Sequence, residues 1–518
     1  MAGIKALAKD TAIYGLSSII GRFLNWCLVP LYVYLFPTEE YGIVSYLYSF
    51  TAVALIILNY GMETGFFRFA NKEGADPEKV YSTSLISVGT TSLAFIILLS
   101  IFISPVSDAL LLPRHPSYVW LLGVTVAVDA FSNIPFAYLR FRKKPYKFAG
   151  IKLLNVGFNI ALNLFFLLCC PSISEYEASW LIDWFYAPLG GKAFGIGWIF
   201  VANIISTLLV LLCLIPYFGS KIKTFDGSLL RRMLSYSWPL LILGVAGVLS
   251  QNMGQILIPY LFEGHEIEAR EMVGIYGANM KIAIVMVMFT QAFRYAYEPF
   301  IFAQARNKGE DKKQAYCDAM KYFLIFGLFI FLGVMYFLPV LRHFIAPSYW
   351  SGLRVVPVMM VAELCFGVFF NLSLWYKLTD RTRWGMYFSL ICFFLMLGLN
   401  IWLVRAIGIP DGYMGSAWAA LISYFAVMCL SYFIGRHYYP LPYPMGKMAL
   451  YTLLAAGFFA AGEWLYFESA MWLTYIIRTA LLALYIGIVY LCEFRKGKIK
   501  IPGKLSREGT RRRETLPS

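Results

Sequence analysis

Charged residues are scarce in this 518-residue chain, since only 14% of it is Asp, Glu, Lys or Arg. A soluble globular domain is about a quarter charged and about half apolar. Here 60% of the residues are hydrophobic and the mean hydropathy is +0.66. Apolar stretches of about 20 residues, enough to cross a bilayer as a helix, recur from residue 11 almost to the C-terminus. The composition excludes a soluble protein and predicts a helical membrane protein.

Several sequence motifs that carry chemistry are also missing. No GxxxxGK[ST] loop is present, which argues against direct use of ATP. The four histidines lie outside the predicted spans and do not cluster, so they support neither a metal site nor a catalytic triad. The nine cysteines form no CxxC pair and lie mostly within spans, as small buried hydrophobic residues do. We therefore expect no cofactor, no metal and no enzymatic activity.

The apolar stretches predict an all-α integral membrane protein with about fourteen transmembrane helices. Short loops join them, so no soluble catalytic domain is inserted. The predicted spans are 11–35, 41–62, 81–104, 117–139, 146–170, 194–218, 237–262, 274–297, 316–340, 354–376, 384–404, 414–435, 446–466 and 471–492.

The positions of Lys and Arg predict the orientation of the spans. One set of alternate loops, together with both termini, holds 33 of these residues, and the opposite loops hold six. Cytoplasmic loops are the ones enriched in Lys and Arg, so we expect both termini in the cytoplasm. The net charge of +15 then reflects topology and a basic tail facing anionic lipid, and no nucleic-acid partner is expected.

The chain contains an internal repeat of about 230 residues. Pro30 aligns with Pro259, Gly42 with Gly274 and Gly74 with Gly309, at offsets of 229, 232 and 235. A fourth pair, residues 195–206 and 412–423, keeps the same order. Four ordered matches indicate two copies of one six-helix unit, followed by two extra helices.

This repeat predicts four regions: 1–218, 219–440, 441–493 and a basic cytoplasmic tail at 494–518. The first two would be pseudo-symmetric lobes of six spans each, and the third would hold spans 13 and 14. Units with an even number of spans insert the same way up, and transporters of this build place the substrate path between the two halves.

The polar residue that stands out most within a span is Arg22. Thr11, Tyr14, Ser18, Arg22 and Asn25 follow at steps of three or four, which places them on one helical face. A charge at this depth is costly unless it faces water or a partner. We expect Arg22 to line a wet cavity, with pairing to a buried acid as the alternative.

Other polar residues within spans are candidates for the same cavity. The repeat maps Arg22 onto Gln251, beside Asn252 and Gln255. Further buried cations are Lys152, Lys281 and Arg294, some of which are able to snorkel to the interface. The acids Asp129, Glu363, Glu63 and Glu298 would either bind a coupling ion or neutralise a cation, and Glu298 is spaced to pair with Arg294.

Four motifs carry a resemblance to a known family. They are "GMETGFFRFA" (61–70), "GIYGANMKI" (274–282), "AFRYAYEPF" (292–300) and "GYMGSAWAALIS" (412–423). With the fourteen-span layout, they resemble the polysaccharide transport family of the MOP (multidrug/oligosaccharidyl-lipid/polysaccharide) exporter superfamily, which includes Wzx-type flippases.

The resemblance implies a flippase for undecaprenyl-pyrophosphate-linked oligosaccharide units in a bacterial inner membrane. It would work by alternating access and supply O-antigen (part of lipopolysaccharide), capsule or exopolysaccharide. Its partners would be the lipid-linked substrate, membrane lipids and, in some pathways, glycosyltransferases or a polymerase. We expect a monomer.

Two other functions stay open at this stage. A drug/cation antiporter of the same superfamily would need an acid-dominated cavity and commonly has twelve spans, so Arg22 and the span count argue against it. A membrane glycosyltransferase or polymerase would be expected to carry a large outer loop, but the longest outer loop has about 23 residues.

The role of Arg22 is testable by charge. The planar guanidinium offers paired N–H donors to phosphate oxygens, whereas a lysine keeps the positive charge but lacks this paired geometry. Arg22→Ala should abolish export of surface polysaccharide in cells that rely on this chain, and Arg22→Lys should retain part of it. Full export by Arg22→Ala would contradict the prediction that Arg22 lines the cavity.

Overall fold

The computed structural model describes most of the chain. The described residues are 17, 20–21, 23–173, 186–218, 224–305, 311–379, 381, 383–466 and 470–493. Within them, the side chains of residues 295, 296, 298–305, 311 and 312 are not described.

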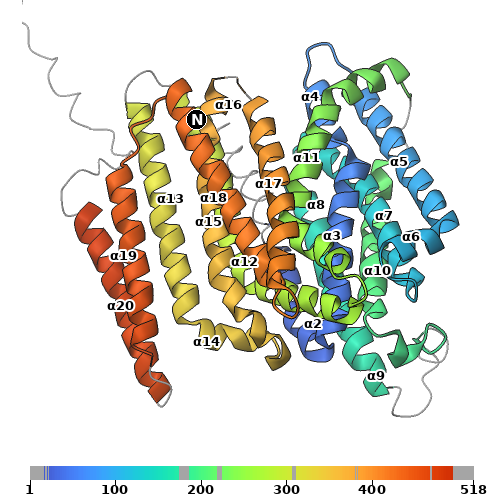
Figure 1. The fold of residues 1–518 in the computed structure, drawn as a ribbon. Helices are drawn as coiled ribbons and strands as arrows, with labels where there is room; N and C mark the ends of the chain where they lie inside the picture. The colour runs from blue at the N-terminus through green and yellow to red at the C-terminus, as the bar shows by residue number, and fades with distance from the viewer. Residues whose placement is uncertain are drawn as a thin grey trace, which may run out of the picture. The chain divides into compact units, whose positions relative to one another are not determined.

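The described residues form helices joined by short connections (Figure 1). The first repeat contributes α2 Val29–Leu35, α3 Thr38–Asn59, α4 Met62–Ala70, α5 Pro77–Ile101, α6 Ile103–Ala109, α7 Pro116–Phe141, α8 Pro145–Leu164, α9 Cys170–Ile173 and α10 Gly197–Leu214. The rest comprises α11 Gly227–Leu261, α12 Glu266–Ala305, α13 Asp311–Tyr336, α14 Leu338–Leu341, α15 Val355–Leu372, α16 Leu374–Leu378, α17 Arg383–Ile407, α18 Tyr413–Tyr438, α19 Met445–Trp464 and α20 Met471–Glu493.

The predicted all-α membrane fold is confirmed. In the described part of the chain, 13 helices are long and apolar enough to span a bilayer, and a shorter apolar helix covers Phe23–Leu35. That helix is the second half of the first predicted span, most of whose first half lies outside the described residues. The helices match the predicted spans in order, which follows from the strength of a 20-residue hydropathy signal.

Local sequence fixes where individual helices start and bend. Asp226 caps α11, because its Oδ1 accepts hydrogen bonds from the backbone N–H groups of Ser228 and Leu229 at 2.9 and 3.0 Å. Lys79 donates to the same carboxylate at 2.8 Å and lowers the pKa of Asp226. Between α3 and α4 the chain bends at Tyr60 and Gly61, which both adopt positive φ, and Gly61 permits this at little cost.

The chain divides into two compact units. Unit 1 comprises residues 1–320 and 338–442, and unit 2 comprises 321–337 and 443–518. Unit 1 therefore contains most of both predicted six-helix regions, whereas unit 2 joins the second half of α13 to α19 and α20. The boundaries predicted from the repeat stay predictions.

Within unit 1, α3 and α12 cross at two glycines, and the contact is reciprocal. A Cβ added to Gly42 would overlap the carbonyl oxygen of Arg270, and one added to Gly274 would overlap that of Thr38. Each of these carbonyls belongs to the residue four positions before the other glycine. Gly42 and Gly274 are the pair that the repeat alignment equates, so the crossing has the contact pattern of a two-fold axis between the copies.

Other contacts join the helices of the first repeat to those of the second within unit 1. They lie at the end of the helices where α3 begins, which we call the Thr38 end. Arg270 pairs with Glu39 at 3.2 Å, and the Tyr349 hydroxyl donates to the carbonyl of Phe36 at 2.9 Å. The Trp26 ring stacks on Phe344 with centroids 4.0 Å apart. The Thr38 end is thus closed by backbone, ionic and aromatic contacts.

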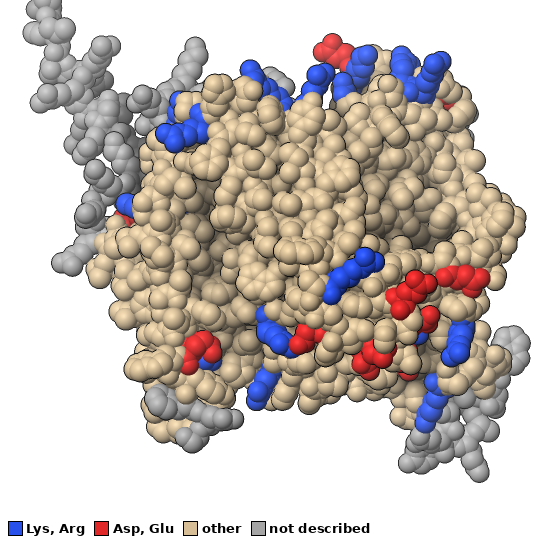
Figure 2. Space-filling model, in the orientation of Figure 1, with Lys and Arg blue, Asp and Glu red and all other residues tan. Residues whose placement is uncertain are grey.

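Most charged side chains of the face drawn in Figure 2 lie along its upper edge or in its lower half. Its upper edge, over the ends of α4, α5 and α11, is mainly basic, and acidic and basic residues mix toward the lower edge. The exposed residues Lys72, Arg231 and Arg232 belong to the loop after α4 and the start of α11.

Unit 2 is held together by buried charges near both ends of its three helices, which lie side by side in Figure 1. The Glu493 carboxylate accepts from Lys321 at 2.6 Å, Lys447 at 2.9 Å and Tyr451 at 2.7 Å. Near the other end, Arg478 is only 1% exposed and donates to the carbonyls of Gly462 and Tyr336. The buried charges of Glu493 and Arg478 are thus satisfied by hydrogen bonds within unit 2.

Close packing of α19 on α13 predicts the effect of one methyl group. A Cβ at Gly462 would overlap the Tyr336 ring, whose hydroxyl donates to the Phe458 carbonyl at 2.6 Å. Gly462→Ala should therefore lower the free energy of unfolding by about 1–3 kcal/mol, the usual range for overpacking. Denaturant unfolding of the purified protein in detergent measures this.

The matched control lies on the same helix. A Cβ at Gly457 would meet no atom within 4 Å, so Gly457→Ala should be neutral or stabilise by up to about 1 kcal/mol. Equal stability of the two variants would contradict the packing described for Gly462.

Candidate functional site

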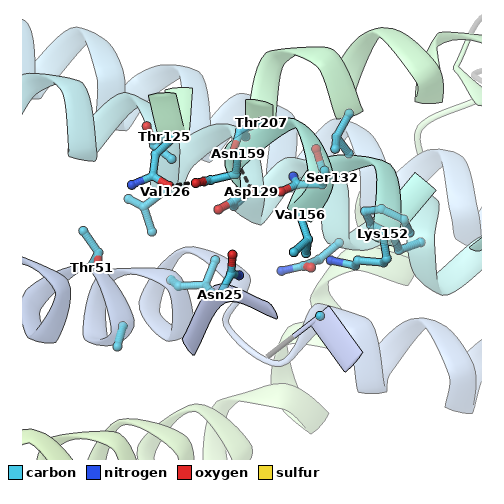
Figure 3. Close-up of a pocket in the computed structure, with 18 of the residues that line it drawn as sticks. Asn25, Thr51, Thr125, Val126, Asp129, Ser132, Lys152, Val156, Asn159 and Thr207 are labelled. Atoms are coloured by element: carbon cyan, nitrogen blue, oxygen red, sulfur yellow. Dashed lines mark hydrogen bonds between the residues drawn. The ribbon is translucent and has the colours of Figure 1, made fainter. Parts of the chain in front are cut away.

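A polar cavity of about 510 Å³ lies within the helices of the first repeat. α7, α8 and α10 form most of its wall, and α3 and the chain before α2 complete it (Figure 3). Its described polar lining residues are Ser17, Asn25, Tyr48, Thr51, Thr125, Asp129, Ser132, Asn133, Lys152, Asn155, Asn159, Asn203 and Thr207. Helices of high hydropathy thus enclose a space in which polar groups predominate.

Two opposite charges share this polar cavity. The Thr207 hydroxyl donates to Asp129 Oδ1 at 3.3 Å, and the Lys152 ammonium lies 4.2 Å from the centre of the Phe136 ring. Asp129 and Lys152 form no ion pair with each other or with another described residue. Both are therefore placed to interact with a molecule or water inside the cavity.

A chain of side-chain hydrogen bonds ties four helices together along the cavity wall. The Tyr32 hydroxyl donates to Asn163 Oδ1 at 3.0 Å, and Asn163 Nδ2 donates to Asn159 Oδ1 at 2.7 Å. Asn159 Nδ2 donates to Asn203 Oδ1, and Asn203 Nδ2 donates to the Tyr48 hydroxyl. The chain runs through α2, α8, α10 and α3 and fixes the orientation of each amide.

Sequence reasoning missed these asparagines. Asn155, Asn159 and Asn163 recur every four residues along α8, so they lie on one face of a hydrophobic helix. This spacing was available as a signal, but the predicted site comprised only charged residues and the amides related to Arg22 by its helical face or by the repeat. Polar side chains between membrane helices join those helices by hydrogen bonds.

A second, smaller cavity of about 300 Å³ adjoins the first and is called here the carboxamide pocket. The two share Asn25, Tyr48, Asn159 and Asn203. Side chains from both repeats line it: Asn25, Leu28, Val29, Tyr32, Tyr41, Val44, Ser45, Tyr48, Ser49, Asn159 and Asn203 from the first, and Asn252, Gln255 and Lys281 from the second. The shared residues make the two cavities neighbours.

Four predicted site residues meet in the carboxamide pocket: Asn25, Asn252, Gln255 and Lys281. Gln255 Oε1 accepts from the Ser49 hydroxyl, and Asn252 Nδ2 donates to the Val248 carbonyl at 2.9 Å. Gln251, predicted to join them, is exposed and is not among the residues lining either cavity.

The other predicted residues lie elsewhere or are not described. Arg22 lies outside the described residues, although its neighbour Gly21 lines the polar cavity. The side chain of Glu298 is likewise outside them. The Arg294 guanidinium lies 3.8 Å over the Phe370 ring. Glu63 pairs with Arg140, and Glu363 on α15 lines neither cavity.

Comparison with known proteins identifies the family. The family model described as "Polysaccharide biosynthesis protein" matches residues 7–302, more than half of the chain. The chain belongs to this family. The resemblance seen in the sequence motifs is thereby confirmed. No curated protein matches the sequence significantly.

Solved structures share the fold of this family member. One is an inward-facing multidrug resistance MATE family transporter of the MOP superfamily, with a TM-score of 0.62, 14% identity and coverage of 83% of this chain and 97% of that one. Another is the lipid II flippase MurJ in an inward closed conformation, with a TM-score of 0.62, 12% identity and coverage of 92% and 98%. These similarities confirm the predicted MOP-type fold.

The asparagine chain predicts different effects at two positions of α8 in this family member. Asn159 Nδ2 donates across to α10, to Asn203 Oδ1 and, at 3.4 Å, to the Ser206 hydroxyl, whereas Asn155 lines the polar cavity and has no hydrogen bond to a described residue. Interhelical hydrogen bonds in membranes contribute about 0.6–1.7 kcal/mol each. Asn159→Leu should therefore lower the free energy of unfolding by about 1–2 kcal/mol.

Asn155→Leu is the matched control, because it removes the same group one helical turn away. It should leave the free energy of unfolding within about 0.5 kcal/mol of the wild-type value. Denaturant unfolding in detergent checks both variants. Equal stability of the Asn159 variant and the wild type would contradict a role of the chain in joining the helices.

Proposed function

We propose that this protein is a flippase that moves undecaprenyl-pyrophosphate-linked oligosaccharide units across a bacterial inner membrane. One observation carries the proposal: two adjoining polar cavities lie among membrane-spanning helices and combine lysines with many amides and hydroxyls. The family match supports a role in polysaccharide biosynthesis. MurJ, a lipid II flippase, shares the fold.

The lining groups suit the two polar parts of such a substrate. Lysine ammonium groups bind phosphate oxygens as point charges, and Lys152 and Lys281 would hold the pyrophosphate with Arg22. Amides and hydroxyls both donate and accept hydrogen bonds, as sugar hydroxyls require. Asn25, Asn252 and Gln255 would therefore contact the oligosaccharide.

Transport would proceed by alternating access, in which the cavities open to one side of the membrane at a time. The Thr38 end, closed by the Gly42–Gly274 crossing, would be the periplasmic end, because the loops rich in Lys and Arg lie at the opposite ends of the helices. Both termini would then be cytoplasmic. The substrate would enter from the cytoplasm and leave after the contacts at the Thr38 end separate.

The exported glycan would be an O-antigen, capsule or exopolysaccharide unit made and polymerised by partner enzymes, with no catalytic step in this chain. Asp129 would either bind a coupling ion or balance Lys152, and Glu363 is a second candidate for ion coupling. A drug/cation antiporter is the alternative function, since a MATE family transporter shares the fold and Asp129 lines the polar cavity.

The decisive experiment removes the protein and follows its substrate. Deletion of the gene should cause complete lipid-linked repeat units to accumulate on the cytoplasmic face, with loss of surface polymer. Mass spectrometry of extracted lipids measures the units, and a periplasmic glycosidase reports their sidedness. Unchanged intermediates would exclude the flippase, and increased drug sensitivity alone would favour the antiporter.

Returning variants to the deletion strain tests the cavity itself. Lys152→Gln should lower export about tenfold or more, because a hydrogen bond to a charged group contributes roughly 1.5–3 kcal/mol, and Lys152→Arg should retain more. Lys147→Gln is the control, since Lys147 is exposed on the same helix. Equal export by the Lys152 and Lys147 variants would contradict the proposal that Lys152 binds the substrate.

A further inference from the structure

An apolar pocket of about 630 Å³ lies beside the polar cavity. α3, α5 and α7 line it together with the short helix α6 and its neighbouring residues. Its described lining is Leu47, Phe50, Thr51, Val53, Ala54, Ile57, Phe95, Leu98, Leu99, Phe102, Pro105, Val106, Ala109, Leu110, Val119, Leu122, Gly123 and Val126. Only Thr51 has a polar side chain, so the pocket excludes charged groups and accepts hydrocarbon.

The apolar pocket and the polar cavity share a wall. Thr51 of α3 and Leu122 and Val126 of α7 line both spaces. Beyond this wall lies Asp129, one turn further along α7, with Lys152 across the polar cavity. A charged compartment and a hydrocarbon compartment therefore lie on two sides of the same three residues.

The apolar pocket has a buried floor and an exposed rim. Leu47, Leu99 and Leu122 are buried at its floor, whereas Ile57, Leu98 and Phe102 are about half exposed. Exposed aliphatic and aromatic side chains on membrane-spanning helices face lipid chains. The rim gives a hydrocarbon chain in the bilayer a route into the pocket.

We propose that the apolar pocket holds part of the polyisoprenyl chain of the lipid-linked substrate while its pyrophosphate lies in the polar cavity. This inference rests on the proposed function and adds the location of the substrate's hydrocarbon chain. A molecule with an anionic head and a long hydrocarbon tail cannot place both in one polar space, because burying charge and wetting hydrocarbon are both unfavourable. The two compartments adjoin at Thr51, Leu122 and Val126, so one molecule would occupy both, with its chain passing beside these three residues.

Neighbouring positions of α5 provide a matched test. Leu98 is 55% exposed and Ile97 is 51% exposed, but only Leu98 lines the apolar pocket. Each is replaced by photoreactive benzoylphenylalanine in the full-length protein. The protein is reconstituted in phosphatidylethanolamine/phosphatidylglycerol vesicles with or without undecaprenyl pyrophosphate, irradiated and analysed by mass spectrometry.

The expected result is an adduct with undecaprenyl pyrophosphate at position 98, enriched at least fivefold over its share of the vesicle lipid. Position 97 should give adducts in proportion to the bulk lipids. Equal adduct ratios at the two positions would overturn the proposal, and so would phospholipid adducts alone at position 98. This measurement does not require transport, so its result is independent of the gene-deletion result.

A second pair of variants tests whether export requires the apolar pocket. Leu98→Trp should fill the pocket and lower export at least fivefold, with an unchanged unfolding midpoint, whereas Ile97→Trp should export normally. Normal export by Leu98→Trp, in a strain whose deletion accumulates lipid-linked units, would overturn the pocket assignment and leave the flippase intact. An adduct at position 98 without accumulation in the deletion strain would overturn the flippase and retain the lipid site.

Discussion

The crossing of α3 and α12 at Gly42 and Gly274 is the contact on which the rest of unit 1 depends. Neither position has room for a Cβ, so the two backbones approach each other directly. Ser45 and Ser49 follow along α3 by one and two turns and line the carboxamide pocket. The crossing is thus the closed end of that pocket, and replacing either glycine would push α3 away from α12, the helix that brings Lys281 to the residues of the first repeat.

Two kinds of polar contact surround the cavities, and an opening at the crossing affects them differently. The asparagine chain from Tyr32 to Tyr48 joins only helices of the first repeat. Ser49 with Gln255, and the hydroxyls of Tyr46 and Tyr260, join α3 to α11 across the repeats. Separation at the Thr38 end would break the second kind and preserve the first. Lys152 and Asp129 would then keep their positions while Gln255 moves away.

The sequence predicted the helices well and the cavities only in part. Hydropathy over about 20 residues identifies a span because a lipid-exposed backbone must satisfy its own hydrogen bonds, and the repeat alignment paired the glycines that touch. Gln251 and Gln255 lie one turn apart on one face of α11, yet only Gln255 reaches the pocket. Periodicity defines a helical face, but where a cavity ends along that face depends on the neighbouring helices. The asparagines of α8 were missed because they carry no charge and are related to Arg22 neither by its helical face nor by the repeat.

The charges around the two cavities bear on which ligand they suit. Their described lining contains Lys152 and Lys281 against a single acid, Asp129. Uncompensated charge within a membrane is unfavourable, so a site with an excess cation is stabilised by an anion and disfavours a second cation. A pyrophosphate would supply the missing negative charge, and its two phosphates would offer oxygens to both lysines. A cationic drug would add to the excess and would have only Asp129 to neutralise it. The balance of charge therefore favours an anionic head group over a cationic drug.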